Sequence, residues 1–444
     1  MKEKEFLPLV KERLGISELN PMQKKMLDCS SEGHNIILLS PTGTGKTLAF
    51  ILPLLKLMKL STGRVQCVVI APSRELVIQI ANVVRSIAPG FKTVTLYGGH
   101  KMEDEENSLK IVPDIIVATP GRLLDHAKRR NVDLLPCRLL VLDEFDKILE
   151  LGFEEEMSKI CKRLKNVSRT ILTSATRAET LPDFIRMEGA KTLDFLGSEG
   201  KVRNRMRVHR VDSDGKDKLD SLVALLAALE KESAPERTII FVNYRESAER
   251  IARYLSEKNI DCVLYHGALN QIEREKAIAK FNNASRPILI ATDLAARGLD
   301  IEHVAHIIHY HSPLTIEVWT HRNGRTARID RDGDIYRLIG PDEDIKEYVD
   351  FDDTMHIDPT ASPTARSEWE TLYIAEGRKE KISRGDIAGF LMKEGGLEPN
   401  EVGKIDVMDH YSLVAVARKR AEQVVKKLEN AKLKGRKRRL RISD

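Results

Sequence analysis

Residues 138–146 read Arg-Leu-Leu-Val-Leu-Asp-Glu-Phe-Asp, an apolar run that ends in carboxylates. A near-continuous apolar run, without alternation, predicts a strand that is buried on both faces of a parallel sheet. A carboxylate at the tip of such a strand, here Asp143, suits one side of a Mg²⁺ ion, and Glu144 can orient or deprotonate a water molecule. This stretch therefore predicts an α/β fold with a hydrolytic site at the carboxyl end of its sheet.

A glycine-rich segment earlier in the chain supplies the other half of such a site. Ser40-Pro-Thr-Gly-Thr-Gly-Lys-Thr47 follows another apolar run. Backbone N–H groups of Thr42, Gly43, Thr44 and Gly45 can wrap phosphates, Lys46 can reach the outer phosphates, and Thr47 can hold Mg²⁺ together with Asp143. Ser40 replaces the usual first glycine, and a lone structural glycine turn is the alternative. The combination with Asp143-Glu144 predicts a nucleotide site.

Composition indicates a soluble protein of several domains. The chain has 444 residues, which predicts two to three domains, with 42% hydrophobic and 31% charged residues. The net charge is only +5, but residues 418–444 contain twelve Lys and Arg against three Asp and Glu. This basic end favours an anionic polymer as partner, and nucleic acid before membrane.

Cysteine spacing and hydropathy favour the cytoplasm. The five cysteines are scattered without a CxxC pair, which is typical of reduced thiols. The N-terminus has no apolar stretch of signal-peptide type, and residues 50–60, the longest apolar segment, are broken by Pro53 and two lysines. We expect a cytoplasmic protein without membrane spans, and a monomer.

Short β-branched runs divide the chain into three parts. Two similar series of buried strands predict two α/β lobes, joined by a basic linker at 197–205. The expected strands are 35–39, 66–71, 93–97, 114–118, 139–142 and 170–173, then 207–211, 238–242, 262–265, 287–291, 306–310 and 334–338. A third part follows the Pro/Ser/Thr-rich stretch 358–364, and its β-α-β-β-α-β order is a plan shared by RNA-recognition modules. The expected domains are 1–200, 205–355 and 366–444.

Upstream of the phosphate loop, Gln23 can pair with the N6 and N7 positions of adenine. Phe6, seventeen residues earlier, can stack on the same ring, although it fits an apolar core equally well. Ser174-Ala-Thr176 ends another predicted strand, either as a turn with small hydroxyls or as a link between the metal site and the second lobe.

The second lobe contains His321-Arg-Asn-Gly-Arg-Thr-Ala-Arg328. These arginines form either a solvated basic face or an arginine finger for the γ-phosphate. Residues 291–300 follow a strand and can contact ribose or a nucleic-acid backbone. His303, His306, His309 and His311 have spacings that suggest a metal site, but they straddle a strand and their side chains should diverge.

Taken together, these motifs resemble those of the DEAD-box RNA helicases over roughly residues 1–345. The resemblance rests on an ordered set of segments: Gln23, Ser40–Thr47, Pro72–Leu76, Gly98-Gly99, Thr119–Arg122, Asp143–Asp146, Ser174–Thr176, His266-Gly267, Gln271–Arg274, Ala291–Asp300 and His321–Arg328. It implies two RecA-like lobes, ATP and Mg²⁺ as cofactors, and RNA as partner.

The same resemblance assigns roles to single residues. It implies that Gln23 reads adenine, that Lys46, Thr47, Asp143 and Glu144 form the ATP–Mg²⁺ site, and that Asp300 contacts the ribose. Arg325 and Arg328 would be the arginine fingers, and His321 would couple hydrolysis to RNA through Ser174 and Thr176. The residues implied to touch the RNA backbone are Arg74, Gly99, Thr119, Arg122, Gly267, Arg274 and Thr292.

Three positions depart from the family pattern, with Phe145, Asn323 and Ala327 where alanine, isoleucine and glycine are usual. Phe145 is expected to pack inward, where its bulk can shift Asp146. These departures leave open an RNA clamp with little turnover as an alternative, and a DNA helicase is a second one. The hypothesis is that ATP and single-stranded RNA together close the cleft between the lobes and open short duplexes locally.

The third part is similar to the C-terminal domain of DbpA-type helicases, through residues 371–374, 377–389 and 403–405. This similarity implies an RRM-like domain that binds large-subunit (23S) ribosomal RNA near the peptidyl-transferase region during ribosome assembly. Tyr373 and Tyr411 are candidates for stacking on bases, or ordinary sheet aromatics. Lys379, Lys381 and residues 436–441 are candidates for phosphate contacts.

Overall fold

The computed structural model describes most of the chain, in two compact units that meet in sequence at residues 204 and 205. The described residues are 3–29, 32–41, 43–60, 62–99, 101–177, 181–196, 206–230, 235–293, 301, 304–326, 333–364, 366–437 and 439–443. The predicted linker 197–205 therefore lies outside them. Within the described residues, no helix is long and apolar enough to cross a bilayer.

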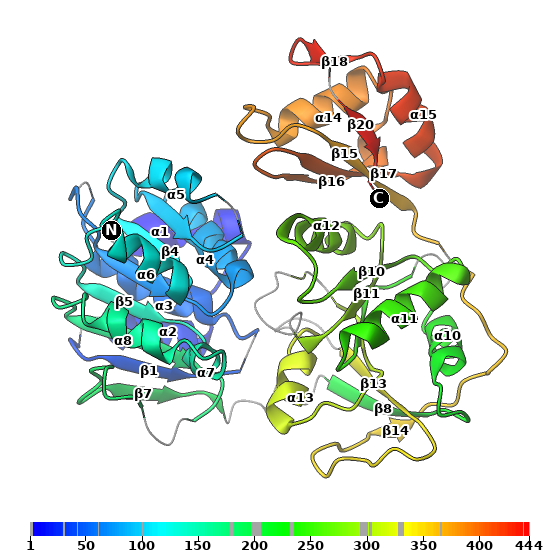
Figure 1. Cartoon of the computed structure of the whole chain (residues 1–444), viewed down its shortest axis with the longest axis horizontal. Coiled ribbons are helices and arrows are strands. Elements are labelled where there is room, and N and C mark those ends of the chain that lie inside the picture. Colours follow the sequence, from blue (N-terminus) through cyan, green and yellow to red (C-terminus); the bar gives the residue numbers. More distant parts are fainter. Residues whose placement is uncertain are drawn as a thin grey trace. The chain divides into compact units, whose positions relative to one another are not determined.

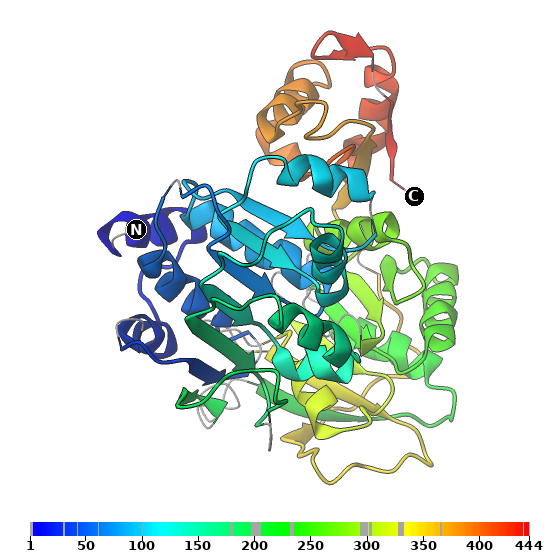
Figure 2. The same ribbon diagram turned by 60° about the vertical axis from the view of Figure 1, so that its left-hand side comes forward.

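The first unit is a parallel sheet of seven short strands in the order β3-β4-β2-β5-β6-β1-β7, with helices on both faces (Figures 1 and 2). The strands are β1 (Ile36–Leu39), β2 (Cys67–Ile70), β3 (Thr93–Leu96), β4 (Ile115–Ala118), β5 (Leu139–Leu142), β6 (Arg169–Ser174) and β7 (Lys191–Asp194). The helices are α1 (Glu3–Leu14), α2 (Pro21–Cys29), α3 (Lys46–Leu57), α4 (Arg74–Ile87), α5 (Met102–Leu109), α6 (Pro120–Lys128), α7 (Phe145–Glu150) and α8 (Glu154–Cys161).

Along each central strand, alternate side chains pack into two separate apolar cores, one on each face of the sheet. Val69 and Val141 pack with Phe50 and Ile80 on one face of the sheet, whereas Leu140 and Leu142 pack on the other face. Because both faces are covered, the strands carry continuous apolar runs, as the sequence predicted. The edge strand β7 escaped the sequence prediction because only Leu193 of its four residues is buried.

The second unit begins with a sheet of the same topology, in the order β10-β11-β9-β12-β13-β8-β14. Numbering each sheet from its own first strand makes the two orders identical. The strands are β8 (Met206–Asp212), β9 (Thr238–Phe241), β10 (Cys262–Tyr265), β11 (Ile288–Ala291), β12 (His306–His309), β13 (Gly333–Ile339) and β14 (Asp353–Thr354). The helices are α10 (Leu219–Ala228), α11 (Arg245–Glu257), α12 (Gln271–Asn282) and α13 (Ile316–Asn323). The predicted pair of similar α/β lobes is confirmed.

The C-terminal part is an antiparallel sheet in the order β16-β17-β15-β20 with two helices packed on it. Its elements are β15 (Trp369–Ile374), α14 (Arg384–Lys393), β16 (Val402–Val407), β17 (Ser412–Ala417), α15 (Arg418–Leu428), β20 (Leu440–Ile442) and a small hairpin of β18 (Lys432–Leu433) and β19 (Arg436–Lys437). Helix α14 begins with a capping box, in which Oγ of Ser383 accepts a hydrogen bond from the N–H of Asp386 and the Asp386 carboxylate accepts one from the N–H of Ser383. The predicted β-α-β-β-α-β order is confirmed.

Candidate functional site

The phosphate loop joins β1 to α3, and its described part closes on itself. Gly45 caps α3 with φ +87°, a left-handed conformation that favours glycine, and a Cβ there would lie 2.6 Å from Nε2 of Gln23 and displace it. Lys46 is buried, and its Nζ donates a 2.9 Å hydrogen bond to the carbonyl of Ser40. Thr44 is held through its hydroxyl, which donates to the carbonyl of Pro41 at 2.9 Å. Helix α3 thus starts with its unbonded N–H groups at this loop, as anion binding requires.

Two residues that precede β1 form hydrogen bonds with the backbone of this loop. The amide oxygen of Gln23 accepts a 3.0 Å hydrogen bond from the N–H of Asn20, and its Nε2 donates to the carbonyl of Gly45 at 3.3 Å. The side chain of Asn20 donates to the carbonyl of Thr44 at 2.9 Å. Phe6 is fully buried in the apolar core as an anchor, which was the alternative left open. The stacking of its ring on adenine stays a prediction.

Asp143 lies at the end of β5 in a buried polar cluster. Oγ1 of Thr173 donates a 2.6 Å hydrogen bond to Oδ1 of Asp143, and the same hydroxyl oxygen accepts one of 3.1 Å from the N–H of Glu144. Burial raises the pKa of Asp143 to about 6, and the charge of Glu144 adds to this, whereas Lys46 and Thr173 oppose it. The site therefore favours a neutralising cation beside this carboxylate.

Glu144 has φ +49°, so the chain turns sharply between β5 and α7. This turn sends Phe145 into the apolar core, where it is 2% exposed, as predicted. The bulk of Phe145 does not prevent contact between Asp146 and the segment after β6, because Oγ1 of Thr176 donates to Oδ2 of Asp146 at 3.3 Å. Ser174, the last residue of β6, donates through Oγ to the carbonyl of Thr176 at 2.7 Å.

Strand order explains why these residues meet. The phosphate loop follows β1 and leads into Lys46 and Thr47 at the start of α3. Asp143 and Glu144 follow β5, and Ser174 ends β6 with Thr176 two residues later. These strands are neighbours in the order β5-β6-β1, and all of them run in parallel. Their carboxyl ends therefore lie at one edge, as the sequence predicted for an open α/β sheet. Thr42 lies outside the described residues.

The residues implied to bind RNA in the first unit follow β2, β3 and β4. Arg74 opens α4 after β2, Gly99 follows β3, and Thr119 and Arg122 follow β4. These strands are neighbours in the order β3-β4-β2. Gly99 has φ +103°, and a Cβ there would meet a terminal nitrogen of Arg74 at 2.2 Å, so the arginine lies directly against the glycine backbone. The sheet edge thus brings this second set together as well.

In the second unit, the arginine near the end of α13 is buried and is not part of a solvated basic face. Arg322 is fully buried and donates to Oδ1 of Asp293 at 2.6 Å, to Oδ1 of Asn243 at 2.8 Å and to the carbonyl of His311 at 3.1 Å. His321 and Arg325 are also buried, at 5% and 9% exposure. Arg328 and Asp300 lie outside the described residues.

The departure at Asn323 has a local explanation. Its Oδ1 lies 2.8 Å from Nε2 of His309 on β12, and burial lowers the pKa of His309 well below its ordinary value. The neutral ring donates through Nε2 to this amide oxygen. Asparagine therefore supplies a hydrogen-bond acceptor, which isoleucine lacks. His306 instead contacts Glu236 at 3.0 Å, and His311 accepts a 3.2 Å hydrogen bond from the N–H of Asn243. The described histidines therefore diverge, as predicted, and His303 is outside the described residues.

The candidate RNA residues of the second unit gather after β10 and β11. A terminal nitrogen of Arg274, in the first turn of α12, donates to the carbonyl of Gly267 at 2.7 Å. The N–H of Thr292 donates to the carbonyl of Tyr265 at 3.3 Å, at the end of β10. The structure therefore brings all three together at the carboxyl ends of neighbouring strands.

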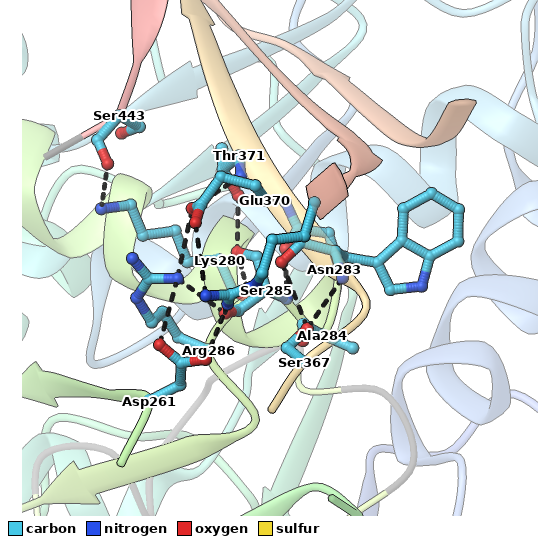
Figure 3. A network of polar contacts seen from close by, with 12 residues as sticks. Asp261, Lys280, Asn283, Ala284, Ser285, Arg286, Ser367, Glu370, Thr371 and Ser443 are labelled. Carbon is cyan, nitrogen blue, oxygen red and sulfur yellow. Dashed lines mark hydrogen bonds and ion pairs between the residues drawn. The ribbon is translucent and has the colours of Figure 1, made fainter. Parts of the chain in front are cut away.

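The sheet of the C-terminal part lies against α12 and the turn that follows it (Figure 3). Oγ1 of Thr371 accepts a 2.9 Å hydrogen bond from Asn283 and lies 2.6 Å from Oγ of Ser285. Nζ of Lys280 donates to the carbonyl of Ser443 at 3.2 Å, and Arg286 lies 3.2 Å from Glu370. Sequence reasoning missed these contacts, because their residues carry no motif.

The aromatic pair of this sheet faces the same helix. The rings of Tyr373 and Tyr411 stack with centroids 5.5 Å apart, and the hydroxyl of Tyr411 donates to Glu275 at 2.7 Å. Lys276 lies over the ring of Tyr373, and Ala279 packs with Tyr411. Both rings are therefore engaged by α12, and neither is presented as an open stacking platform.

Comparisons with known proteins agree with this geometry. Three family models match: DEAD/DEAH box helicase over residues 20–184, helicase conserved C-terminal domain over 217–330, and DbpA RNA binding domain over 371–442. The ATP-dependent RNA helicase DbpA of Escherichia coli K12 is 32% identical, covering 97% of this chain and 95% of that protein. DbpA of Bacillus subtilis 168 is 28% identical, covering 96% and 94%.

Solved structures of helicases with bound ligands share the fold. Saccharomyces cerevisiae Dbp5 bound to RNA and ADP BeF3 has a TM-score of 0.65 and 27% identity, over 76% of this chain and 87% of that one. Mss116 bound to single-stranded RNA and UDP-BeF has a TM-score of 0.69 and 26% identity, over 81% and 78%. The strand-end motifs, the paired sheets and these matches agree. The chain belongs to the DEAD-box ATP-dependent RNA helicases and carries a DbpA-type RNA-binding domain after its two helicase domains.

Proposed function

We propose that this helicase opens short duplexes in large-subunit (23S) ribosomal RNA during ribosome assembly, as a cytoplasmic monomer. The observation that carries the proposal is the DbpA RNA binding domain at residues 371–442, in a chain that aligns over 97% of its length with a DbpA helicase. The cysteines at 29, 67, 137, 161 and 262 are free thiols, which suits the cytoplasm. The proposed domain limits are 1–200, 205–355 and 366–444.

The first unit would hold ATP and Mg²⁺ with the residues at the ends of β1, β5 and β6. The donors fit a hard cation, because the carboxylate of Asp143 and the hydroxyl of Thr47 are oxygen ligands, and the raised pKa of Asp143 reflects a buried charge without full compensation. Bound Mg²⁺ supplies charge neutralisation at the phosphates. Lys46 would exchange its bond to the Ser40 carbonyl for the outer phosphates, Glu144 would orient the attacking water, and Gln23 would read adenine.

The second unit would contribute the remaining charges. Arg325 and Arg328 would stabilise the charge that develops on the γ-phosphate, worth about 10³–10⁵ in rate in comparable enzymes. Asp300 would contact the ribose. His321 would couple hydrolysis to RNA through Ser174 and Thr176, and the latter already contacts Asp146. RNA would contact Arg74, Gly99, Thr119, Arg122, Gly267, Arg274 and Thr292.

The energetic scale suits local opening. Stacking in a duplex is about 1.4 kcal/mol per step, so opening six steps costs roughly 8 kcal/mol. A micromolar interaction supplies about the same free energy. Binding of one strand can therefore open a short helix without processive movement, and a domain that binds a chosen RNA raises the effective concentration of the motor there.

The experiment compares stimulation of the ATPase of the full chain by three polymers of equal length. These are a large-subunit ribosomal RNA fragment from the peptidyl-transferase region, a small-subunit fragment, and DNA of the large-subunit sequence. We expect half-maximal stimulation at an at least about tenfold lower concentration of the large-subunit RNA. Equal stimulation by both RNAs contradicts the ribosome-assembly proposal and leaves the family assignment intact, whereas stimulation by DNA contradicts RNA specificity.

A charge reversal locates that preference on the C-terminal part. Lys379 and Lys381 are exposed next to the start of α14, so K379E/K381E is expected to remove the preference for the large-subunit fragment. Lys393 is exposed at the other end of α14, and K393E is the control for a charge reversal elsewhere in the same domain. An unchanged preference in the double variant would exclude these two lysines from the RNA-binding surface.

A further inference from the structure

A buried carboxylate in the first unit joins two of its candidate RNA segments. Glu105 on α5 is 3% exposed. Its Oε1 accepts a 2.8 Å hydrogen bond from the N–H of Tyr97, and its Oε2 accepts bonds from Nε of Arg122 at 2.5 Å and from Nε2 of His126 at 2.8 Å. No motif in the sequence marked this residue.

The hydrogen bonds around His126 show which of its two ring nitrogens donates to Glu105. His126 is fully buried, and its Nδ1 lies 3.2 Å from Nδ2 of Asn131. That amide nitrogen also donates to the carboxylate of Glu106 at 3.1 Å, so Asn131 presents a donor and Nδ1 of His126 accepts. The ring proton therefore sits on Nε2 and points at Glu105.

The two segments that Glu105 joins come from neighbouring strands. Tyr97 directly follows β3 and precedes Gly98 and Gly99, while Arg122 lies in the first turn of α6 after β4. A bond through Nε sets the plane of the guanidinium, because all atoms of that group are coplanar. One carboxylate thus sets the direction of Arg122 relative to the backbone at Gly99.

We propose that Glu105 is a positioning residue for RNA binding, which aims the guanidinium of Arg122 at a phosphate of the RNA strand. The inference rests on the proposed role of Arg122 in RNA binding. Glu105 is negatively charged beside a phosphate site, so its charge alone weakens RNA binding, whereas its geometry strengthens it. If only the charge of Glu105 matters, its removal strengthens RNA binding. If the positioning of Arg122 matters more, its removal weakens RNA binding.

Glu105→Gln is the informative variant. A carboxylate accepts on both oxygens, but a glutamine amide accepts on one and turns its NH₂ group toward either the Tyr97 N–H or the Arg122–His126 pair. With a 20-nucleotide oligouridylate as probe, we expect the RNA concentration for half-maximal ATPase stimulation to rise about fivefold to twentyfold. The kcat at saturating RNA and the KM for ATP should stay within about twofold, because the nucleotide site follows other strands.

Glu103 is the matched control, since it is exposed on the same helix. Glu103→Gln removes the same charge without touching Arg122, and should leave the RNA concentration unchanged or lower it. If Glu105→Gln leaves the RNA concentration for half-maximal ATPase stimulation unchanged or lowers it, the proposal is overturned. A parallel loss of kcat at every RNA concentration, together with a lowered Tm, would show a purely structural role and overturn it too.

A double-mutant cycle identifies the residue through which Glu105 acts. In an Arg122→Ala background, Glu105→Gln should have no further effect on the RNA concentration, and an equal factor in both backgrounds contradicts the proposal. If Glu105→Gln does not fold, Arg122→Lys tests the same idea, because lysine keeps the charge and lacks Nε, and wild-type RNA dependence there refutes it. Normal RNA dependence of Arg122→Ala would instead show that the RNA role of Arg122 is wrong, so the two failures are distinguishable.

Discussion

Thr173 donates a 2.6 Å hydrogen bond to Oδ1 of Asp143, and its hydroxyl oxygen accepts the N–H of Glu144. One side chain on β6 thereby fixes two successive residues at the end of β5. The hydroxyl sets the direction of the Asp143 carboxylate and fixes the backbone at Glu144. Thr173 is therefore part of the proposed nucleotide site, although it lies within the buried strand β6.

Thr173→Val keeps the shape of the side chain and removes both hydrogen bonds. A hydrogen bond to a charged group contributes about 1.5–3 kcal/mol, so we expect kcat for the RNA-stimulated ATPase to fall about tenfold to a hundredfold. Steady-state ATPase assays at saturating RNA measure this. Thr170→Val, on the same strand and also buried, is the control. Equal activities of the two variants would show that the hydroxyl of Thr173 does not position Asp143 and Glu144 for catalysis.

Asp143→Asn should stabilise the ligand-free protein while it abolishes ATPase activity. Burial holds the pKa of Asp143 at about 6, above its ordinary value of 3.8, so the folded state binds more protons than the unfolded state between these values. The stability contributed by this group is present below pH 3.8 and is lost as the pH rises to 6. The variant should therefore match the wild type near pH 4 and exceed its free energy of unfolding by up to about 3 kcal/mol at pH 7.

Urea denaturation at both pH values, without nucleotide or divalent cation, measures this difference. Asp183→Asn, at an exposed position, should show no such pH-dependent gap. The same raised pKa predicts that binding of Mg²⁺–ATP weakens as the pH falls through 6, because the proton competes with the cation. A stability gap that is the same at pH 4 and pH 7 would contradict the assignment of the shift to Asp143.

Asn323→Ile, which restores the residue usual in the family, should destabilise this protein. It leaves Nε2 of the buried His309 without its acceptor, at a cost of about 1–3 kcal/mol. A lowered Tm of the second unit measures the loss. The double variant His309→Phe/Asn323→Ile removes both partners and should lose less than the sum of the single variants. Additive losses would show that the two side chains do not depend on each other.

Thr371→Val should loosen the C-terminal sheet from the turn after α12. The hydroxyl is fully buried between Asn283 and Ser285, so its removal leaves two buried polar groups without this partner. Hydrogen exchange of residues 283–286 should quicken. Ser412→Ala is the control, because Oγ of Ser412 bonds within the same sheet domain, to the carbonyl of Glu376 at 2.8 Å. If both variants behave alike, loss of domain stability explains the effect rather than loss of the contact.

Patterns confined to a few consecutive residues were predictable from the sequence. The buried strands, the glycine-rich loop, the Asp143–Asp146 turn and the capping box at Ser383 all carry local signals. Phe145 was also predicted to pack inward, since it directly follows the strand tip. The strand β7 was not predicted, because an edge strand buries few of its side chains.

The missed residues depend on neighbours that are distant in the chain. Thr173 and Glu105 look like an ordinary strand hydroxyl and an ordinary helix carboxylate until β6 meets β5 and α5 meets α6. Arg322 looked like part of a basic face, but three partners from other segments surround it. Tyr373 and Tyr411 could not be assigned to α12 before the C-terminal sheet was seen against that helix.

The strand order β3-β4-β2-β5-β6-β1 places the proposed polynucleotide contacts on one half of a single sheet edge and the nucleotide contacts on the other. Only the ladder between β2 and β5 separates them, with Ile70 opposite Leu142. We expect the two ligands to be thermodynamically linked through this shared sheet. The factor by which RNA tightens the binding of ATP then equals the factor by which ATP tightens the binding of RNA, so loss of the γ-phosphate is expected to weaken RNA binding.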